Sequence, residues 1–387
     1  MAETERYVLS NPHPDVEHGV PRQPIECLLT PPDQGLNPDT GLVLIIDGDG
    51  FTPASSYNTF LRRYLASRYN CLAVGVFYFG CRLNSLDSVR LQPNPDFFVN
   101  LQAAHGIAVS APATLDADAL IRQLCRTLAG QGVTALDRSC WLIRSFEEEY
   151  SSFGLLPALD HLQVIGALMQ RFPLNPNRFY VMGSSSGGHI AMMMGKLAPQ
   201  TFSMIVDNSG EIRNPMVQPT RRTFRRGRIA GVECRGLELS PWDEDPASPH
   251  HFSEHHRRIR DLAIPEHMGP SPTFRRLYHS VGDPLIPIAE RAAYAALAAR
   301  FGPVSLEGID AGRLDGTLFK SLEHGMKASL LHLFEDAWRA QQALAARKDD
   351  GYTDFCRNAR HRFDCGSGIY SLSFSRRGAV ELRFEAV

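Results

Sequence analysis

The stretch that decides the fold is FYVMGSSSGGHI, residues 179–190. Its first four residues are apolar or aromatic and predict a buried strand, and the serines and glycines that follow predict a sharp turn. The apolar run from Ile190 onward predicts a small, buried helix. Gly-x-Ser-x-Gly falls on Gly183, Ser185 and Gly187. Such tiny flanking residues let a strand and a helix close around a serine whose hydroxyl projects from the turn.

This pattern matches the nucleophile elbow of the α/β-hydrolases. The helix N-terminus behind the turn offers backbone N–H groups to a developing oxyanion. Gly-x-Ser-x-Gly also occurs in ordinary strand-to-helix loops, so the pattern alone has low specificity. The preceding strand and the following helix favour the catalytic interpretation. The competing frame on Ser186 lacks the first glycine, and the frame on Ser184 lacks both.

Composition limits the classes of protein. The chain has 387 residues, of which 43% are hydrophobic, and a net charge of -2. This charge argues against general nucleic-acid binding, and no apolar run is long enough to cross a bilayer. The first residues are acidic and polar, unlike a signal peptide. The eight cysteines form no Cys-x-x-Cys pair. We therefore expect reduced thiols and a cytoplasmic location.

The order of predicted elements gives the fold class. Apolar runs predict strands at residues 25–29, 42–46, 71–79, 202–207, 276–281 and 304–307. Helical patterns cover residues 57–65, 155–172, 288–301 and 326–346. Strands that alternate with helices predict a mostly parallel sheet covered by helices on both faces. The predicted class is therefore α/β, an α/β-hydrolase fold with cap insertions and a C-terminal β-hairpin.

Two stretches interrupt the alternation and one follows it. Within a hydrolase domain at residues 25–348, residues 80–150 read as an insertion without a clear parallel strand, with a helix near 116–129. Residues 209–270 read as a cap over the site. Residues 349–387 form an extension, and its alternating apolar residues between 368 and 386 predict a hairpin. That hairpin is either appended or paired with the N-terminal strand.

A serine nucleophile needs a base, and the base needs an orienting acid. In α/β-hydrolases the order along the chain is serine, acid, histidine. Asp283 follows a late strand, although Gly-Asp-Pro is also an ordinary turn. His324 follows the last strand, although most single histidines are merely surface or packed residues. Because each residue follows a strand in the right order, we predict the triad Ser185, Asp283 and His324, with Asp207 as the reserve acid.

The oxyanion hole should combine the N–H of Ser186 with one from the loop after the strand at 42–46. Asp49 is the predicted backbone donor on that loop, beside Gly50. A carboxylate beside an oxyanion is unfavourable, so the Asp49 side chain should point away from it.

Two clusters have an ordinary interpretation and a functional one. One cluster holds five arginines: Arg221, Arg222, Arg225, Arg226 and Arg228. We favour the interpretation that they form a solvated face of the cap. The alternative is that they receive an anionic substrate such as an acidic sugar or a phosphate. The histidines His250, His251, His255 and His256 suggest zinc, but neighbouring histidines cannot all point one way and no partner has ligand spacing. We predict no metal.

Further motifs resemble one bacterial family. They are residues 47–50, 153–160, 207–209, 259–262, 278–280 and 322–326, together with the elbow. The chain resembles uncharacterised α/β-hydrolase-like proteins, many encoded near genes for flagellin or surface-glycan modification, over roughly residues 25–345. The resemblance implies the fold and the triad positions Ser185, Asp283 and His324, but no substrate. The single acid of Gly282-Asp283-Pro284 departs from the more acidic loop that such proteins carry.

The first functional hypothesis is a cytoplasmic serine esterase or deacylase that works through an acyl-enzyme and needs no cofactor. Its expected partner is a small-molecule or glycan ester, such as an acylated sugar or glycan precursor. The second hypothesis is an O-acyltransferase that passes the acyl group to a sugar hydroxyl. The third is a catalytically silent binding or scaffold protein of the same fold.

Overall fold

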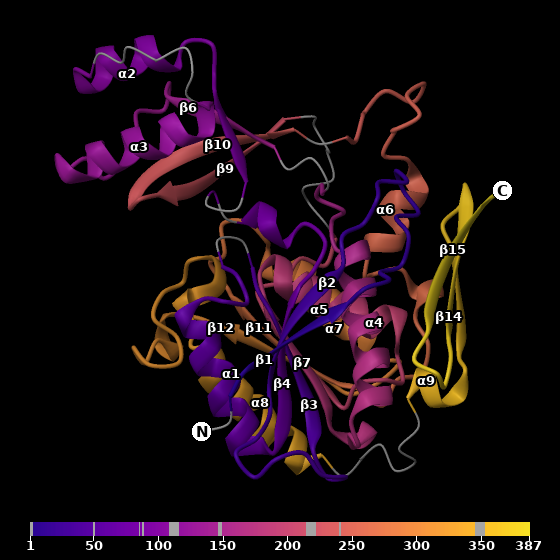
Figure 1. Cartoon of the computed structure of the whole chain (residues 1–387). Coiled ribbons are helices and arrows are strands. Elements are labelled where there is room, and N and C mark those ends of the chain that lie inside the picture. Colours follow the sequence, from indigo (N-terminus) through magenta and orange to yellow (C-terminus); the bar gives the residue numbers. More distant parts are fainter. Residues whose placement is uncertain are drawn as a thin grey trace. The chain divides into compact units, whose positions relative to one another are not determined.

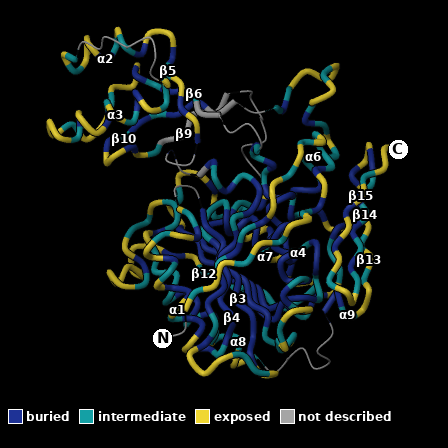
Figure 2. The backbone as a smooth tube through the Cα atoms, in the orientation of Figure 1, coloured by how far each residue is buried: buried dark blue, intermediate teal, exposed yellow. Residues whose placement is uncertain are grey.

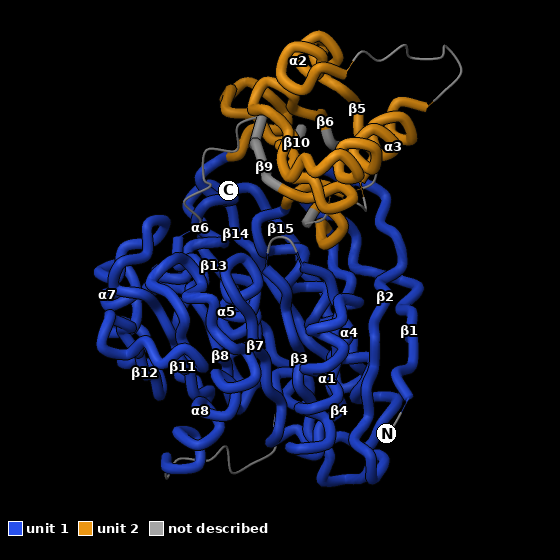
Figure 3. Tube along the Cα trace, turned by 90° about the vertical axis from the view of Figure 1, so that its left-hand side faces the viewer, with its two compact units in different colours: residues 1–79, 152–215, 253–387 blue, residues 80–151, 216–252 orange. Residues whose placement is uncertain are grey.

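The computed structural model describes residues 3–48, 51–84, 86, 89–107, 116–145, 149–213, 222–239, 241–344 and 353–387. The chain divides into two compact units (Figure 3). Unit 1 comprises Met1–Phe79, Ser152–Pro215 and Ser253–Val387, and unit 2 comprises Gly80–Ser151 and Met216–Phe252. The insertion expected at 80–150 and the middle of the cap expected at 209–270 therefore belong to one unit, whereas both ends of that cap segment belong to unit 1.

Unit 1 is built on an eight-stranded sheet with the order β1-β2-β4-β3-β7-β8-β11-β12 (Figure 1). The strands are β1 (Glu5–Leu9), β2 (Ile25–Thr30), β3 (Gly41–Ile46), β4 (Cys71–Phe77), β7 (Phe179–Ser184), β8 (Met204–Asn208), β11 (Phe274–Ser280) and β12 (Val304–Ile309). β2 runs antiparallel to β1 and β4, and all other neighbouring pairs are parallel. This order with an antiparallel second strand is the α/β-hydrolase fold, as predicted.

Helices cover both faces of this sheet. They are α1 (Ser56–Tyr69), α4 (Leu155–Arg171), α5 (Ser186–Leu197), α7 (Ile288–Ala298) and α8 (Leu330–Ala343). Met204 and Val206 of β8 pack in one cluster with α1 and α8. Ile205 points to the opposite face because side chains alternate along a strand. There it meets α5, since a Cβ on Gly195 would lie 2.4 Å from its Cδ1.

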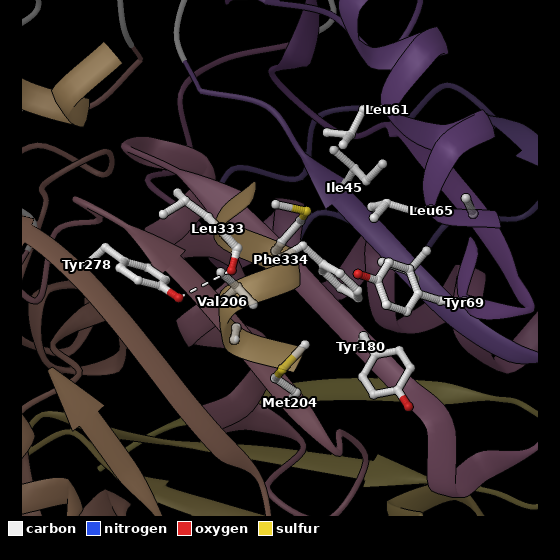
Figure 4. Packing of buried hydrophobic residues seen from close by; sticks show 14 of the residues in the cluster. Ile45, Leu61, Leu65, Tyr69, Tyr180, Met204, Val206, Tyr278, Leu333 and Phe334 are labelled. Carbon is white, nitrogen blue, oxygen red and sulfur yellow. Dashed lines mark hydrogen bonds between the residues drawn. The ribbon is translucent and has the colours of Figure 1, made fainter. Parts of the chain in front are cut away.

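Apolar side chains from strands and helices form the main core. Figure 4 shows Leu61 and Leu65 of α1 and Leu333 and Phe334 of α8 against the sheet. The Tyr278 hydroxyl donates a 3.2 Å hydrogen bond to the carbonyl oxygen of Leu333, which ties β11 to α8. All six residues of β3 are buried, and Figure 2 shows it in dark blue. A strand covered on both faces reads as one continuous apolar run, as this one does.

The predicted closing helix at 326–346 is wrong at its start. α8 begins at Leu330, after the short turn η5 (His324–Lys327). Met326 and Lys327 have φ values of 56° and 44°, and this left-handed backbone cannot continue a right-handed helix. The edge strand β1 was not predicted, because its five residues are mostly exposed and carry no clear apolar alternation.

The extension after α8 forms its own sheet. It contains α9 (Asp354–Arg357) and the antiparallel strands β13 (Arg360–Asp364), β14 (Gly368–Phe374) and β15 (Val380–Ala386). The predicted hairpin is present as β14 and β15. The alternative pairing with the N-terminal strand is wrong, because β1 pairs with β2. The shorter helical elements of unit 1 are η2 (Pro176–Arg178), α6 (Glu254–Arg260), η3 (Pro265–His267) and η4 (Ala311–Arg313).

Unit 2 has a four-stranded sheet with the order β5-β6-β10-β9. Its elements are η1 (Cys81–Asn84), β5 (Arg90–Pro93), α2 (Phe97–His105), α3 (Ala117–Gly130), β6 (Trp141–Ser145), β9 (Arg222–Ile229) and β10 (Val232–Leu239). β6 runs parallel to β10, so the expectation of no parallel strand in residues 80–150 is wrong. Among the described residues of both units, no helix has the length and apolar character needed to span a bilayer.

Candidate active site

The elbow is the turn between β7 and α5. Ser185 has φ 54° and ψ -125°, a backbone conformation that non-glycine residues rarely adopt. A Cβ on Gly183 would lie 2.1 Å from the carbonyl oxygen of Gly187, and one on Gly187 would lie 2.4 Å from that of Ile46. Both contacts are far shorter than real Cβ contacts. These two positions therefore accept only glycine, and the strained turn holds Ser185 out from the backbone.

Three predicted side chains lie in one line of contacts. The Oγ of Ser185 is 2.8 Å from the Nε2 of His324, and the Nδ1 of His324 is 2.8 Å from the Oδ2 of Asp283. The carboxylate fixes the tautomer in which Nδ1–H donates to Asp283, which leaves Nε2 to accept from the serine hydroxyl. The Asp283 side chain is fully buried, whereas that of His324 is 19% exposed. The imidazole therefore joins a buried carboxylate to an accessible serine.

The Asp283 carboxylate is oriented by its own loop. Its Oδ1 accepts backbone N–H bonds from Leu285 at 2.8 Å and from Ile286 at 3.2 Å. These bonds direct the other oxygen, Oδ2, to His324. His279 braces the same loop, because its Nε2 donates to the Ile286 carbonyl oxygen at 2.8 Å. Burial lowers the pKa of His279, which favours its neutral form.

Asn208 connects the elbow to the segment that carries His324. Its Nδ2 donates to the Oγ of Ser184 at 2.9 Å and to the carbonyl oxygen of Gly325 at 3.2 Å. The backbone carbonyl oxygen of Asn208 accepts a hydrogen bond from the Ser185 N–H at 2.8 Å. One side chain and its backbone thus hold the residues next to Ser185 and His324. Sequence reasoning did not assign Asn208 a role, although its place at the carboxyl end of β8 was a usable signal.

The reserve acid Asp207 has other partners. Its fully buried side chain forms an ion pair with Arg291 of α7, and its Oδ1 accepts the Gly210 N–H at 2.9 Å. Arg291 also donates to the Gly210 carbonyl oxygen at 2.6 Å. The structure therefore brings Asp283, and not Asp207, to His324. Asp207 instead fixes the chain after β8 against α7.

The predicted oxyanion donors are described only in part. Ser186 is the first residue of α5, where backbone N–H groups have no acceptor within the helix. A Cβ on Gly48 would lie 2.7 Å from the Ser184 carbonyl oxygen and 3.4 Å from the Cβ of Ser185. The chain after β3 therefore passes directly beside the elbow. Asp49 and Gly50 lie outside the described residues.

The start of that loop is anchored by two buried contacts. The Tyr78 hydroxyl donates to the carbonyl oxygen of Asp47 at 3.0 Å, and the Asn58 side-chain amide donates to its carboxylate. Burial raises the pKa of Asp47 to about 6. These bonds fix where β3 ends, and therefore where the loop that was predicted to hold the second oxyanion donor begins.

The predicted arginine and histidine clusters are described only in part. Arg221 lies outside the described residues, and so do the side chains of Arg222, Arg225 and Arg226 on β9, while Arg228 is exposed. Their role in substrate binding stays a prediction. His255 and His256 contact Ser253 at the start of α6. Within the described part of the chain, no group of three or more histidine, cysteine or acidic side chains is arranged to hold a metal ion.

Comparison with known proteins gives a family match over nearly the whole chain. The model of a family described as "Protein of unknown function (DUF2920)" matches residues 11–383. No curated protein matches the chain.

Several solved structures are similar at low sequence identity. A Mycobacterium tuberculosis puromycin-hydrolyzing peptidase has 13% identity and a TM-score of 0.46, over 88% of this chain and 39% of the peptidase. Est1E from Butyrivibrio proteoclasticus with bound ferulic acid has 12% identity and a TM-score of 0.44, over 86% and 99%. Thermogutta terrifontis esterase 2, phosphonylated by cyclosarin, has 9% identity and a TM-score of 0.43, over 88% and 91%. No activity or substrate transfers from them at this level of similarity.

Proposed function

The chain belongs to the DUF2920 family of proteins of unknown function. From the geometry of its own site, we propose that it is a serine hydrolase that cleaves carboxylic esters through an acyl-enzyme. Ser185 is the nucleophile, His324 the general base and acid, and Asp283 the orienting carboxylate. The observation that carries the proposal is the unbroken pair of 2.8 Å contacts from Ser185 through His324 to Asp283. A serine held on a strained turn and paired with an oriented imidazole has what nucleophilic catalysis requires.

In the first half-reaction, the Oγ of Ser185 forms a bond to the ester carbonyl carbon while its proton passes to the Nε2 of His324. The carbonyl electron pair moves onto oxygen, which the Ser186 N–H and the chain after β3 stabilise. The intermediate then expels the alcohol, which takes the proton from Nε2. Asp283 stays ionised throughout and stabilises the imidazolium that forms.

In the second half-reaction, water attacks the acyl group on Ser185 and gives its proton to His324. The serine leaves with that proton, and the acid is released. A sugar hydroxyl in place of water would give the O-acyltransferase, which uses the same residues in the same roles. The 2.8 Å contact between Ser185 and His324 disfavours the silent scaffold. A protein without catalysis would be free to lose this contact.

We further propose a small-molecule or glycan ester as the substrate. That proposal rests on the chemistry of the triad, which needs an ester carbonyl within reach of Ser185. A cytoplasmic site of action is supported by the eight cysteines, all of them described and none in a disulfide.

The proposal is tested by the hydrolysis of p-nitrophenyl acetate and butyrate. Ser185→Ala, His324→Gln and Asp283→Asn should each lower kcat by about 10³–10⁶-fold with little change in KM, because they remove transition-state stabilisation. Ser203→Ala is the matched control, since the Ser203 hydroxyl donates to the carbonyl oxygen of Asn177 in η2, at the opposite end of β7 from Ser185. Wild-type activity in Ser185→Ala would overturn the proposal. Faster acyl transfer to an added sugar than to water would identify the acyltransferase.

A further inference from the structure

A second, smaller pocket lies in unit 1 at the opposite end of α5 from the elbow. It has a volume of about 30 Å³, and four of the residues that line it carry polar side chains: Lys196 of α5, His267 of η3, Arg275 of β11 and Tyr294 of α7. Lys196 follows Ser185 by eleven residues along α5. At 1.5 Å per helical residue, this separates the pocket from the elbow by about 16 Å. The pocket is thus not part of the site described above.

Arg275 is the main polar group of the pocket that has no counter-charge among the described residues. Its side chain belongs to a residue that is 8% exposed, and its Nη1 has no hydrogen-bond partner among the described residues. Two other buried arginines of unit 1 have carboxylate partners, Arg260 with Glu17 and Arg291 with Asp207, whereas the buried Arg62 donates to the Pro53 carbonyl oxygen. A buried guanidinium without a carboxylate is unfavourable unless something else supplies the charge.

Lys196 adds a second cationic group. Burial lowers its pKa to about 7, so an anion bound beside it favours its charged form. The residue is half-buried, and its Nζ donates to the carbonyl oxygens of Ile259 at 2.7 Å and of Asp261 at 2.8 Å, with a weaker contact to that of Arg258. These bonds satisfy its donors but do not neutralise its charge. No aspartate or glutamate appears among the described residues that line the pocket. The wall is therefore cationic on two sides.

His267 gives the pocket an acceptor as well. Its Nε2 donates to the Asp364 carbonyl oxygen at 2.7 Å, so the neutral ring carries its lone pair on Nδ1. That Nδ1 is buried and has no partner within the described part of the chain. Burial lowers the pKa of His267 to about 4, which keeps the ring neutral near pH 7. A ligand with both a negative charge and an O–H group would supply a counter-charge to Arg275 and a hydrogen-bond donor to the Nδ1 of His267.

We propose that this pocket binds a phosphate group. Its negative oxygens accept from the Arg275 guanidinium, its protonated oxygen donates to the Nδ1 of His267, and Lys196 attracts it through space. A pocket of about 30 Å³ holds about two water molecules, which suits one compact oxyanion and not a whole nucleotide. Sulfate has no O–H group at neutral pH and leaves the His267 acceptor unpaired.

Isothermal titration calorimetry with inorganic phosphate at pH 7 and fixed ionic strength tests the proposal. Wild type should bind one phosphate per chain in a saturable way, with sulfate and acetate at least about tenfold weaker. Arg275→Met should lower phosphate affinity by about tenfold or more. Arg300→Gln is the matched control, because it removes an exposed positive charge of the same unit that does not line the pocket. It should keep the affinity.

His267→Gln provides a second test that does not depend on Arg275→Met folding. It should weaken the preference for phosphate over sulfate while leaving the charge of the pocket intact. Equal binding of all three anions, unchanged affinity in Arg275→Met, or no saturable heat in wild type would each overturn the proposal. A tighter response to acetate would assign the pocket to a carboxylate in place of a phosphate. Ser185→Ala should bind phosphate as wild type does, which separates this inference from the proposed hydrolase.

Discussion

The hydroxyl of Ser280 donates a 2.7 Å hydrogen bond to the carbonyl oxygen of Leu322. This bond joins the end of β11, three residues before Asp283, to the segment that leads into His324. Ser280 also accepts the N–H of Gly282 at 3.1 Å, so it shapes the loop that carries the acid. The distance between the proposed acid and base therefore depends on a side chain that touches neither of them.

Ser280→Ala should reduce kcat for ester hydrolysis by about fivefold and leave KM unchanged, because losing one such bond corresponds to about 1 kcal/mol. The loss should act on the geometry of Asp283 and His324 and not on substrate binding. Steady-state kinetics with a p-nitrophenyl ester measures both constants. Ser203→Ala removes a comparable bond elsewhere and serves as the control. An equal effect of both variants would mean that Ser280 only stabilises the fold.

The two aspartates after β8 and β11 should separate stability from activity. Asp207→Asn leaves the buried Arg291 charge without its partner and should lower the free energy of unfolding by about 3–5 kcal/mol. Asp283→Asn should lower kcat by about 10⁴-fold, because the carboxylate no longer selects the imidazole tautomer. Denaturant unfolding and steady-state kinetics on both variants provide the measurements. If Asp207→Asn were folded and inactive while Asp283→Asn kept full activity, the acid would have to be reassigned to Asp207.

The unfolding free energy should fall as the pH falls from 6.5 towards 4, in part because of His161. This ring is buried in α4 with its Nδ1 on the Pro157 carbonyl oxygen, and burial lowers its pKa to about 4. In the unfolded chain the ring takes up a proton near pH 6.5. The folded state therefore binds fewer protons in this window, and acid favours unfolding by up to about 3 kcal/mol.

Urea unfolding of wild type and His161→Phe at several pH values between 4 and 7.5 measures this contribution. The variant keeps an aromatic ring beside Tyr78 but has no proton to gain. Its stability should depend less steeply on pH between 6.5 and 4. Identical slopes for the two proteins would show that His161 is not neutral and buried in the folded state.

Much of the fold followed from local pattern. The continuous apolar runs at 42–46 and 179–182 became central strands because both faces of the sheet are covered. The glycines around Ser185 were informative because the backbone comes too close for any other residue. The order of Ser185, Asp283 and His324 was predictable because each one follows a strand of a known topology.

The rest depends on contacts between segments that are distant in sequence. Asn208 and Ser280 link loops whose proximity arises only when β7, β8 and β11 line up in the sheet. The sheet of unit 2 joins strands from residues 90–145 and 222–239, and neither set shows a periodicity that points to the other. The start of α8 moved to Leu330 because the turn at 324–327 follows tertiary hydrogen bonds, such as the one that the Gly325 carbonyl oxygen accepts from Asn208.

The most direct test of the proposed nucleophile is labelling of the intact enzyme by an active-site fluorophosphonate. Peptide mass spectrometry then locates the adduct. The account predicts one adduct per chain, located on Ser185 and absent from Ser185→Ala. His324→Gln should label at least about 100-fold more slowly, because the serine loses its base. Folded wild-type protein that stays unlabelled, or that carries the adduct on another residue, would contradict the assignment of Ser185 as the nucleophile.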